Sequence, residues 1–175
     1  MRHDNSRRLL RLAVGMGLLL LAETANSLPD DAKQPIETES LSSELLLEEG
    51  IVIYHGSDAR PAKISQGSLV ITGTEIRLVR KNQVLQSVMA KGKPARFQQQ
   101  PSSDQALVNA SGELITLDNT THLLTIEEAA EFNQAGNTMN ASHIDYNLDT
   151  RRATASGSAD GSQVRMSLQS NQETP

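Results

Sequence analysis

Short runs in which apolar and polar residues alternate, punctuated by glycine, constrain this sequence more than any other feature. Ile51 to Tyr54 lies between Gly50 and Gly56, and further alternating runs follow over residues 69–78, 84–88, 115–117, 124–132, 144–148 and 164–168. Side chains along a β-strand point to opposite faces in turn, so alternation is typical of strands that show one face to a core. The sequence therefore predicts an all-β protein, built as a sandwich, a roll or a solenoid-like stack.

Several segments between these runs are expected to be turns or loops. Residues 57–63, 91–94, 98–105, 118–119, 136–137 and 149–150 carry the glycine, proline, asparagine and aspartate residues that favour turns. Gly73 marks a turn or a bulge between two runs of opposite parity. Residues 127–131 have helix propensity, but the even-numbered alternation continues through them, so we predict a strand there. Residues 40–49 fit a short helix or a strand equally well.

The first 27 residues have the pattern of an export signal. Arg7, Arg8 and Arg11 precede an apolar run from Leu12 to Ala22, and small residues at 25 and 27 suit cleavage after Ser27. The apolar run is shorter than the roughly 20 residues of a membrane-spanning helix. We expect a cleaved signal at 1–27, a single domain over 28–168 and a polar tail at 169–175; an uncleaved membrane anchor is the alternative.

Composition narrows the possible functions. Residues 1–27 hold four of the 16 basic and two of the 21 acidic residues, so the mature chain keeps 12 and 19, a net charge of −7. An acidic surface does not suit phosphate backbones, which argues against nucleic acid as a partner. There is no cysteine, and His55, His122 and His143 lack the spacing of metal ligands. We expect no catalytic residue, no metal and no cofactor, and therefore no enzyme.

Several motifs, in this order and spacing, resemble the periplasmic lipopolysaccharide-transport family of LptA (OstA). They begin with Gln34-Pro35-Ile36, Gly50 with Tyr54 and Gly56, and Gln66-Gly67. They continue with residues 92–97, which read Gly-Lys-Pro-Ala-Arg-Phe, and with a second-half pattern over residues 124–146. The resemblance covers residues 28–155. It departs from the family at Pro61, which lies in an insertion expected to interrupt one early strand, and at Glu128, where a small residue is usual.

The resemblance implies an antiparallel β-jellyroll folded into a V shape, the β-taco. It also implies that an apolar interior holds the acyl chains of lipopolysaccharide. Partners would be lipopolysaccharide, the inner- and outer-membrane parts of the transport machinery, and further copies stacked end to end. The expected location is the periplasm. The candidate lipid-facing residues are Ile36, Thr38, Tyr54, Phe97, Leu117, Phe132 and Tyr146.

Two alternatives stay open at this stage. The seven candidates are equally consistent with an ordinary core, and the protein would then be a structural adaptor that binds partner proteins through its sheet edges. Lys91, Lys93 and Arg96 form a basic cluster near Phe97 that either meets phosphates of a lipid head group or is a solvated turn.

Overall fold

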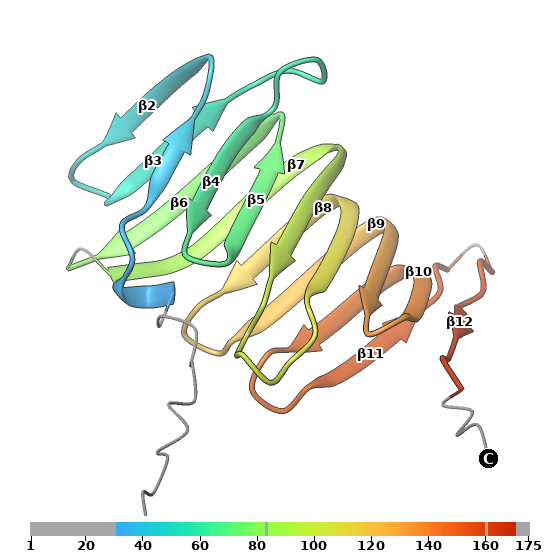
Figure 1. Cartoon of the computed structure of the whole chain (residues 1–175). Helices are drawn as coiled ribbons and strands as arrows, with labels where there is room; N and C mark the ends of the chain where they lie inside the picture. Colours follow the sequence, from blue (N-terminus) through green and yellow to red (C-terminus); the bar gives the residue numbers. More distant parts are fainter. Residues whose placement is uncertain (1–30, 83, 160, 171–175) are drawn as a thin grey trace, which may run out of the picture.

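The computed structural model describes residues 31–82, 84–159 and 161–170 and consists almost entirely of antiparallel strands. Figure 1 shows the strands following one another from the blue N-terminal end to the red C-terminal end of one folded sheet. After a 3-10 turn, η1 (Asp31–Lys33), come β1 (Glu37–Glu39), β2 (Ser42–Leu46), β3 (Ile51–His55), β4 (Ala62–Gln66), β5 (Leu69–Gly73) and β6 (Glu75–Lys81). The remaining strands are β7 (Val84–Gln99), β8 (Val108–Asp118), β9 (Leu123–Gln134), β10 (Asn137–Asn147), β11 (Arg152–Ser156) and β12 (Arg165–Ser167).

The sheet is divided into two half-sheets by a bend that crosses its middle. β7 to β10 pass through the bend, and their pairing shifts register there, for example between Lys91 and Ala95. The first half-sheet contains β1, β4, β5 and β12 with one end of each long strand; the second contains β2, β3, β6 and β11 with the other end. Because each long strand belongs to both half-sheets, the chain itself holds the two walls of a V together.

The early strands are interrupted at the bend instead of passing through it. β5 and β6 are separated by Thr74, whose backbone N–H donates to Lys91 O at 2.7 Å. β3 and β4 are separated by residues 56–61, which confirms the interruption expected around Pro61. The ambiguous residues 40–49 form the strand β2 followed by a turn, so the helical alternative is wrong.

The bend explains one wrong prediction. Residues 91–94 were expected to form a turn, but β7 runs without interruption from Val84 to Gln99. Residues 111–114 and 127–130 are the corresponding bends of β8 and β9. In β9 the bend places Glu128 and Ala129 at φ of 58° and 52°, a left-handed conformation that favours glycine. That is the position where the resemblance noted in the sequence leads us to expect a small residue.

The core lies between the two half-sheets. The buried residues alternate along the strands as predicted, and the strand over residues 127–131 is confirmed against its helix propensity. Each fully buried Leu, Ile, Val or Phe side chain contributes about 1.5–3 kcal/mol relative to exposure. The C-terminal alternation at Val164, Met166 and Leu168 is different, because these side chains are exposed. The strand β11 has no counterpart among the predicted runs.

The N-terminal segment is fixed to the first half-sheet by Asp31. Its carboxylate accepts hydrogen bonds from the backbone N–H of Ser68 at 2.8 Å, the Ser68 hydroxyl at 2.7 Å and Gln99 Nε2 at 3.0 Å. The start of the segment is thereby fastened to the β4–β5 turn. β1 then continues alongside β4 as an edge strand, and Pro35, which has no backbone N–H to donate, lies just before it.

Candidate functional site

Three rows of side chains cover the inner faces of the V. Residues that pair directly across neighbouring strands point to the same face, so the register defines each row. The Phe97 row lies on the first half-sheet and contains Thr38, Ile64, Ile71, Phe97, Ala110, Phe132, Met139 and Met166. The Ile115 row lies on the second half-sheet and contains Ser43, Tyr54, Ile76, Ala90, Ile115, Ile126, Ile144 and Ala155. The Leu117 row is its neighbour: Leu45, Val52, Leu78, Val88, Leu117, Leu124, Tyr146 and Ala153.

The structure places six of the seven predicted residues in these rows. Thr38, Phe97 and Phe132 belong to the Phe97 row, Tyr54 to the Ile115 row, and Leu117 and Tyr146 to the Leu117 row. The seventh, Ile36, precedes β1 by one residue and has the same parity as Thr38. All seven therefore face the interior of the V, although they are spread along most of its length.

The interior is open at its N-terminal end. A hollow of about 370 Å³ lies there between β1 and β4 on one side and β3 and β6 on the other. Ile36, Thr38 and Tyr54 are three of its lining residues; the others are Gln34, Val52, Gln66, Leu78 and Arg80. Val52 and Leu78 were not among the predicted site residues, although Val52 has the parity of the predicted Tyr54 and Leu78 belongs to a predicted alternating run, so that signal was available in the sequence.

The interior is closed further along. Phe97 and Leu117 are each 2% exposed and Tyr146 only 1%, so they are core residues in this conformation. The rings of Phe132 and Tyr146 meet across the V, with centroids 4.8 Å apart and a tilt of 44°. Such an aromatic pair adds about 0.5–1.5 kcal/mol beyond the buried area. The same rows thus form a hollow at one end and a packed core at the other.

A hydrogen bond between the two walls accompanies this ring pair. Tyr146, on the second half-sheet, donates its hydroxyl to Gln134 Oε1 of the first half-sheet at 3.0 Å. Burial raises the pKa of Tyr146 above its ordinary value, and the Gln134 hydrogen bond and the charge of Arg151 act in the opposite direction. The phenol is therefore held as a neutral donor.

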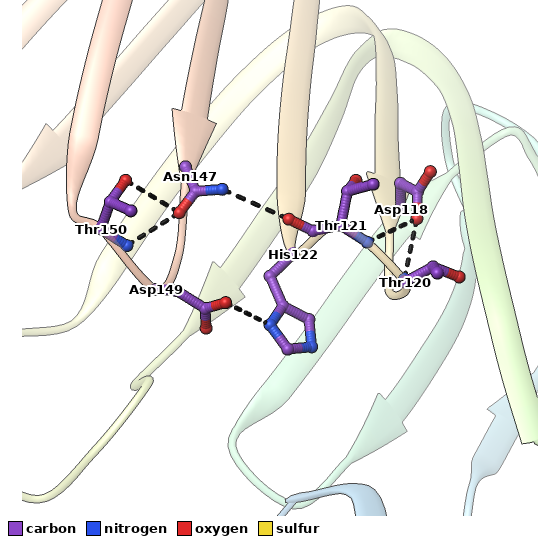
Figure 2. A network of polar contacts seen from close by, with 7 residues as sticks. All are labelled: Asp118, Thr120, Thr121, His122, Asn147, Asp149 and Thr150. Atoms are coloured by element: carbon purple, nitrogen blue, oxygen red, sulfur yellow. Dashed lines mark hydrogen bonds and ion pairs between the residues drawn. The ribbon is translucent and has the colours of Figure 1, made fainter.

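Polar contacts join neighbouring turns at the rim of the second half-sheet (Figure 2). His122 Nδ1 lies 2.7 Å from Asp149 Oδ2, and Asn147 Nδ2 donates to Thr121 O at 3.2 Å. Asp118 accepts from the backbone N–H groups of Thr120 and Thr121 at 2.8 and 3.0 Å, and these bonds lower the pKa of its carboxyl. The β8–β9 and β10–β11 turns are thus tied to each other.

The basic cluster is on the outside of the V. Lys91 Nζ lies 3.4 Å from Glu75 Oε1, and Lys91 follows the inward-facing Ala90 in β7. Arg96 precedes the inward-facing Phe97 and lines an outer hollow with Ser111 and Glu131. Lys93 is exposed and lines a neighbouring hollow with Arg96 and Glu131, so the three basic side chains do not share a face with the interior rows. In the residues that the structure describes, no group of three His, Asp or Glu side chains is placed to hold a metal ion.

A folded antiparallel sheet with an apolar interior between its two half-sheets defines the class of β-jellyroll proteins. The chain belongs to the family described as LptA/(LptD N-terminal domain) LPS transport protein, which it matches over residues 37–152. It is 33% identical over 156 residues to "Lipopolysaccharide export system protein LptH" of Pseudomonas aeruginosa, covering 89% of this chain and 86% of that protein.

A solved structure agrees with this assignment. The crystal structure of LptH, described as the LptA-homologous periplasmic component of the conserved lipopolysaccharide transport device of Pseudomonas aeruginosa, matches with a TM-score of 0.70. The identity is 28%, with 81% of this chain and 100% of that chain covered. These findings confirm the family, the antiparallel β-jellyroll, the periplasmic location and the expectation of a transport protein that is not an enzyme. The described residues contain no helix with the length and apolarity of a membrane span. The predicted cleavage after Ser27 lies outside the described residues.

Proposed function

We propose that this protein carries lipopolysaccharide across the periplasm with the acyl chains shielded between its two half-sheets. The observation that supports this most directly is the continuity of the three rows, which run from the N-terminal to the C-terminal edge with almost no charged side chain. Each acyl methylene transferred from water to such a surface contributes about 0.8 kcal/mol. An aliphatic wall gives this energy without a fixed register, so a lipid can slide along it.

We expect the seven predicted residues to contact the acyl chains, which would enter the interior through the hollow at the N-terminal end. Ile36, Thr38 and Tyr54 are accessible there, so they would meet the lipid first. Phe97, Leu117, Phe132 and Tyr146 would contact it after the two walls separate. A rigid adaptor with a permanently closed core is the second candidate function, and the burial of these last four residues favours it.

Photo-crosslinking in a single strand distinguishes the two functions. A benzophenone side chain at Thr38 faces the interior, whereas one at Glu37, the preceding residue of β1, faces outward. The carrier predicts that purified lipopolysaccharide crosslinks strongly at position 38 and weakly at position 37. Equal labelling at both positions, or none from a folded protein, would support the adaptor.

We also propose that copies join end to end, linking the inner- and outer-membrane parts of the machinery. β1 and β2 each pair with one strand only, and so do β11 and β12, so unpaired strand edges are present at both ends of the sheet. Apolar side chains accompany these edges: Leu45 is 58% exposed at one and Met166 56% at the other. Such edges pair readily with another chain through their free backbone groups.

Light scattering at increasing protein concentration tests this assembly. Leu45→Asp and Met166→Asp, one at each end, should each shift the distribution toward the monomer. Val84→Asp is the matched control, because Val84 is equally exposed at 58% and lies at the β6–β7 turn, away from both end strands. A mass that none of the three variants changes would contradict end-to-end assembly.

A further inference from the structure

Side chains from the two half-sheets contact each other across the open edge of the V, opposite the bend; we call this edge the mouth. The loop 100–107, between β7 and β8, lies at the mouth of the first half-sheet, and the turn 148–151, between β10 and β11, lies at the mouth of the second. Figure 1 shows both along the lower edge of the sheet. Arg151 Nη2 in the turn is 3.6 Å from Asp104 Oδ2 in the loop.

Gln105 strengthens the same connection. With its carboxamide oxygen directed at the guanidinium, Gln105 accepts hydrogen bonds from Arg151 Nη2 at 2.8 Å and from Nε at 3.1 Å. The hydrogen bond that the Ser102 hydroxyl donates to Asp104 and the charge of Arg151 hold the pKa of Asp104 below its ordinary value, so this partner stays ionised well into the acid range. Arg151 thus contacts two consecutive residues of the opposite rim.

A second connection lies beside the first. Gln134 accepts from the Tyr146 hydroxyl at 3.0 Å, and its Nε2 donates to Ala106 O of the loop 100–107 at 3.1 Å. Tyr146 on the second half-sheet is therefore linked through Gln134 to the same loop that Arg151 contacts. Both connections join the loop to β10 or to the turn that follows it.

Each side of this contact is held in place by its own wall. In the turn, Asn147 Oδ1 accepts from the Thr150 backbone N–H at 2.8 Å and from its hydroxyl at 2.9 Å, and Asp149 contacts His122 of the next turn at 2.7 Å (Figure 2). In the loop, Gln105 N donates to Ser102 O at 3.1 Å. The two rims therefore meet as ordered segments.

We propose that Arg151 with Asp104 and Gln105, and Tyr146 with Gln134, form a latch that closes the C-terminal part of the interior and opens when lipid advances from the N-terminal hollow. This inference rests on the proposed carrier function and concerns how access to that same interior is controlled. The Arg151–Asp104 pair is exposed to solvent, and exposed ion pairs are weak, so this contact can break reversibly when an acyl chain enters. Closure without lipid keeps the most apolar part of the rows away from water.

A reversible crosslink across the mouth tests the latch. The protein has no cysteine, so Asp104→Cys with Arg151→Cys provides a unique pair for a bis-maleimide whose spacer is cleaved by reduction. A benzophenone at Thr38 reports lipid entry, and one at Met139, in the C-terminal part of the Phe97 row, reports passage beyond the latch. The probe ligand is purified lipopolysaccharide, added to the exported protein.

We expect the bridged protein to keep its labelling at Thr38 and to lose at least about tenfold of its labelling at Met139, with recovery after reduction. The matched control is His55→Cys with Glu75→Cys, which joins two neighbouring strands of one half-sheet next to the bend and should leave both signals unchanged. Arg151→Gln in the cysteine-free protein should raise labelling at Met139 by about three- to tenfold, since it increases the open fraction.

Two results would overturn the inference, and they are distinguishable. Unchanged labelling at Met139 in the bridged protein would contradict the proposed latch but not the proposed carrier function. If neither position is labelled in the reduced protein, the result would contradict the proposed carrier function and therefore also the latch.

Discussion

The N-terminal and C-terminal parts of the sheet present the same three rows but differ in how the walls are held. β1 to β6 are three to seven residues long and stop at the bend, whereas β7 to β10 are 11 to 16 residues long and pass through it. A strand that passes through the bend fixes both walls relative to each other. The hollow lies among the interrupted strands at the N-terminal end, although β4, β5 and β6 also bury Ile64, Ile71 and Ile76. The inner faces of the continuous strands β8 to β10 are packed, so the described hollow lies where the walls are joined least directly.

The largest test of this comparison uses two residues of the Phe97 row. Phe97→Ala should lower the free energy of unfolding by about 3–5 kcal/mol, because it removes a buried ring from a packed core. Thr38→Ala, at the open end of the same row, should change it by no more than about 0.5 kcal/mol. Urea unfolding followed by circular dichroism measures both. A similar loss in the free energy of unfolding for both variants would contradict the difference in packing between the two ends of the interior.

The two tyrosines give a sharper comparison. Tyr146→Phe should cost about 0.5–1.5 kcal/mol, because Gln134 loses the hydrogen bond that crosses the mouth. Tyr54→Phe, at the N-terminal hollow, should stay within about 0.5 kcal/mol of the parent protein. In a spectrophotometric titration of the folded protein, Tyr146 should ionise above the ordinary tyrosine pKa, and its signal should vanish in Tyr146→Phe. A single transition at the ordinary value would contradict the burial of this phenol.

Strain at the bend of β9 should be relieved by glycine. Glu128 has a φ of 58° and an exposed side chain, so Glu128→Gly should raise the free energy of unfolding by about 0.5–1 kcal/mol. Glu131→Gly, in the regular part of the same strand, should lower it by a similar amount. Thermal unfolding of the two variants compares bend with strand. A loss of stability in both would mean that the bend imposes no strain.

The smallest expected effect concerns how acid changes the stability of the protein through Asp118, which lies at the rim of the second half-sheet. Hydrogen bonds from Thr121 and Thr120 depress the pKa of Asp118 below its ordinary value of 3.8, so the stability it contributes is present above that value and is lost as the pH falls through the depressed one. Asp118→Asn should therefore lose stability less steeply than the parent below about pH 4. Urea midpoints measured from pH 6 to pH 2 show the difference. Parallel profiles would show that Asp118 has the same pKa folded and unfolded.

Local periodicity was sufficient to predict the strands and the inner face of most of them. Ile76, Leu78, Leu124, Ile126 and Phe132 all have the predicted parity and are buried, because alternation is a property of each strand alone. The seven candidate lipid-facing residues face the interior for the same reason. The family resemblance determined which of the inward-facing residues were chosen as candidates. Their contact with lipid remains a prediction.

Features that depend on distant segments could not be predicted in this way. Gly92 and Pro94 favour a turn locally, but pairing with β8 on both sides keeps β7 continuous through them. β11 is a strand because β10 offers it an edge, and its sequence, rich in Arg, Ala, Thr and Ser, carries little apolar alternation. Arg151 reaches Asp104 only after the fold brings together two rims that are 47 positions apart in the chain.

The rows also make the protein modular along its length. Neighbouring strands lie about 4.8 Å apart, so the seven steps of the Phe97 row from Thr38 to Met166 extend over roughly 34 Å. Each further strand added at an edge would lengthen the interior by one such step and leave its cross-section unchanged. Under end-to-end assembly the chain is therefore a unit of length, and the width of the space to be crossed divided by that unit gives the number of copies required.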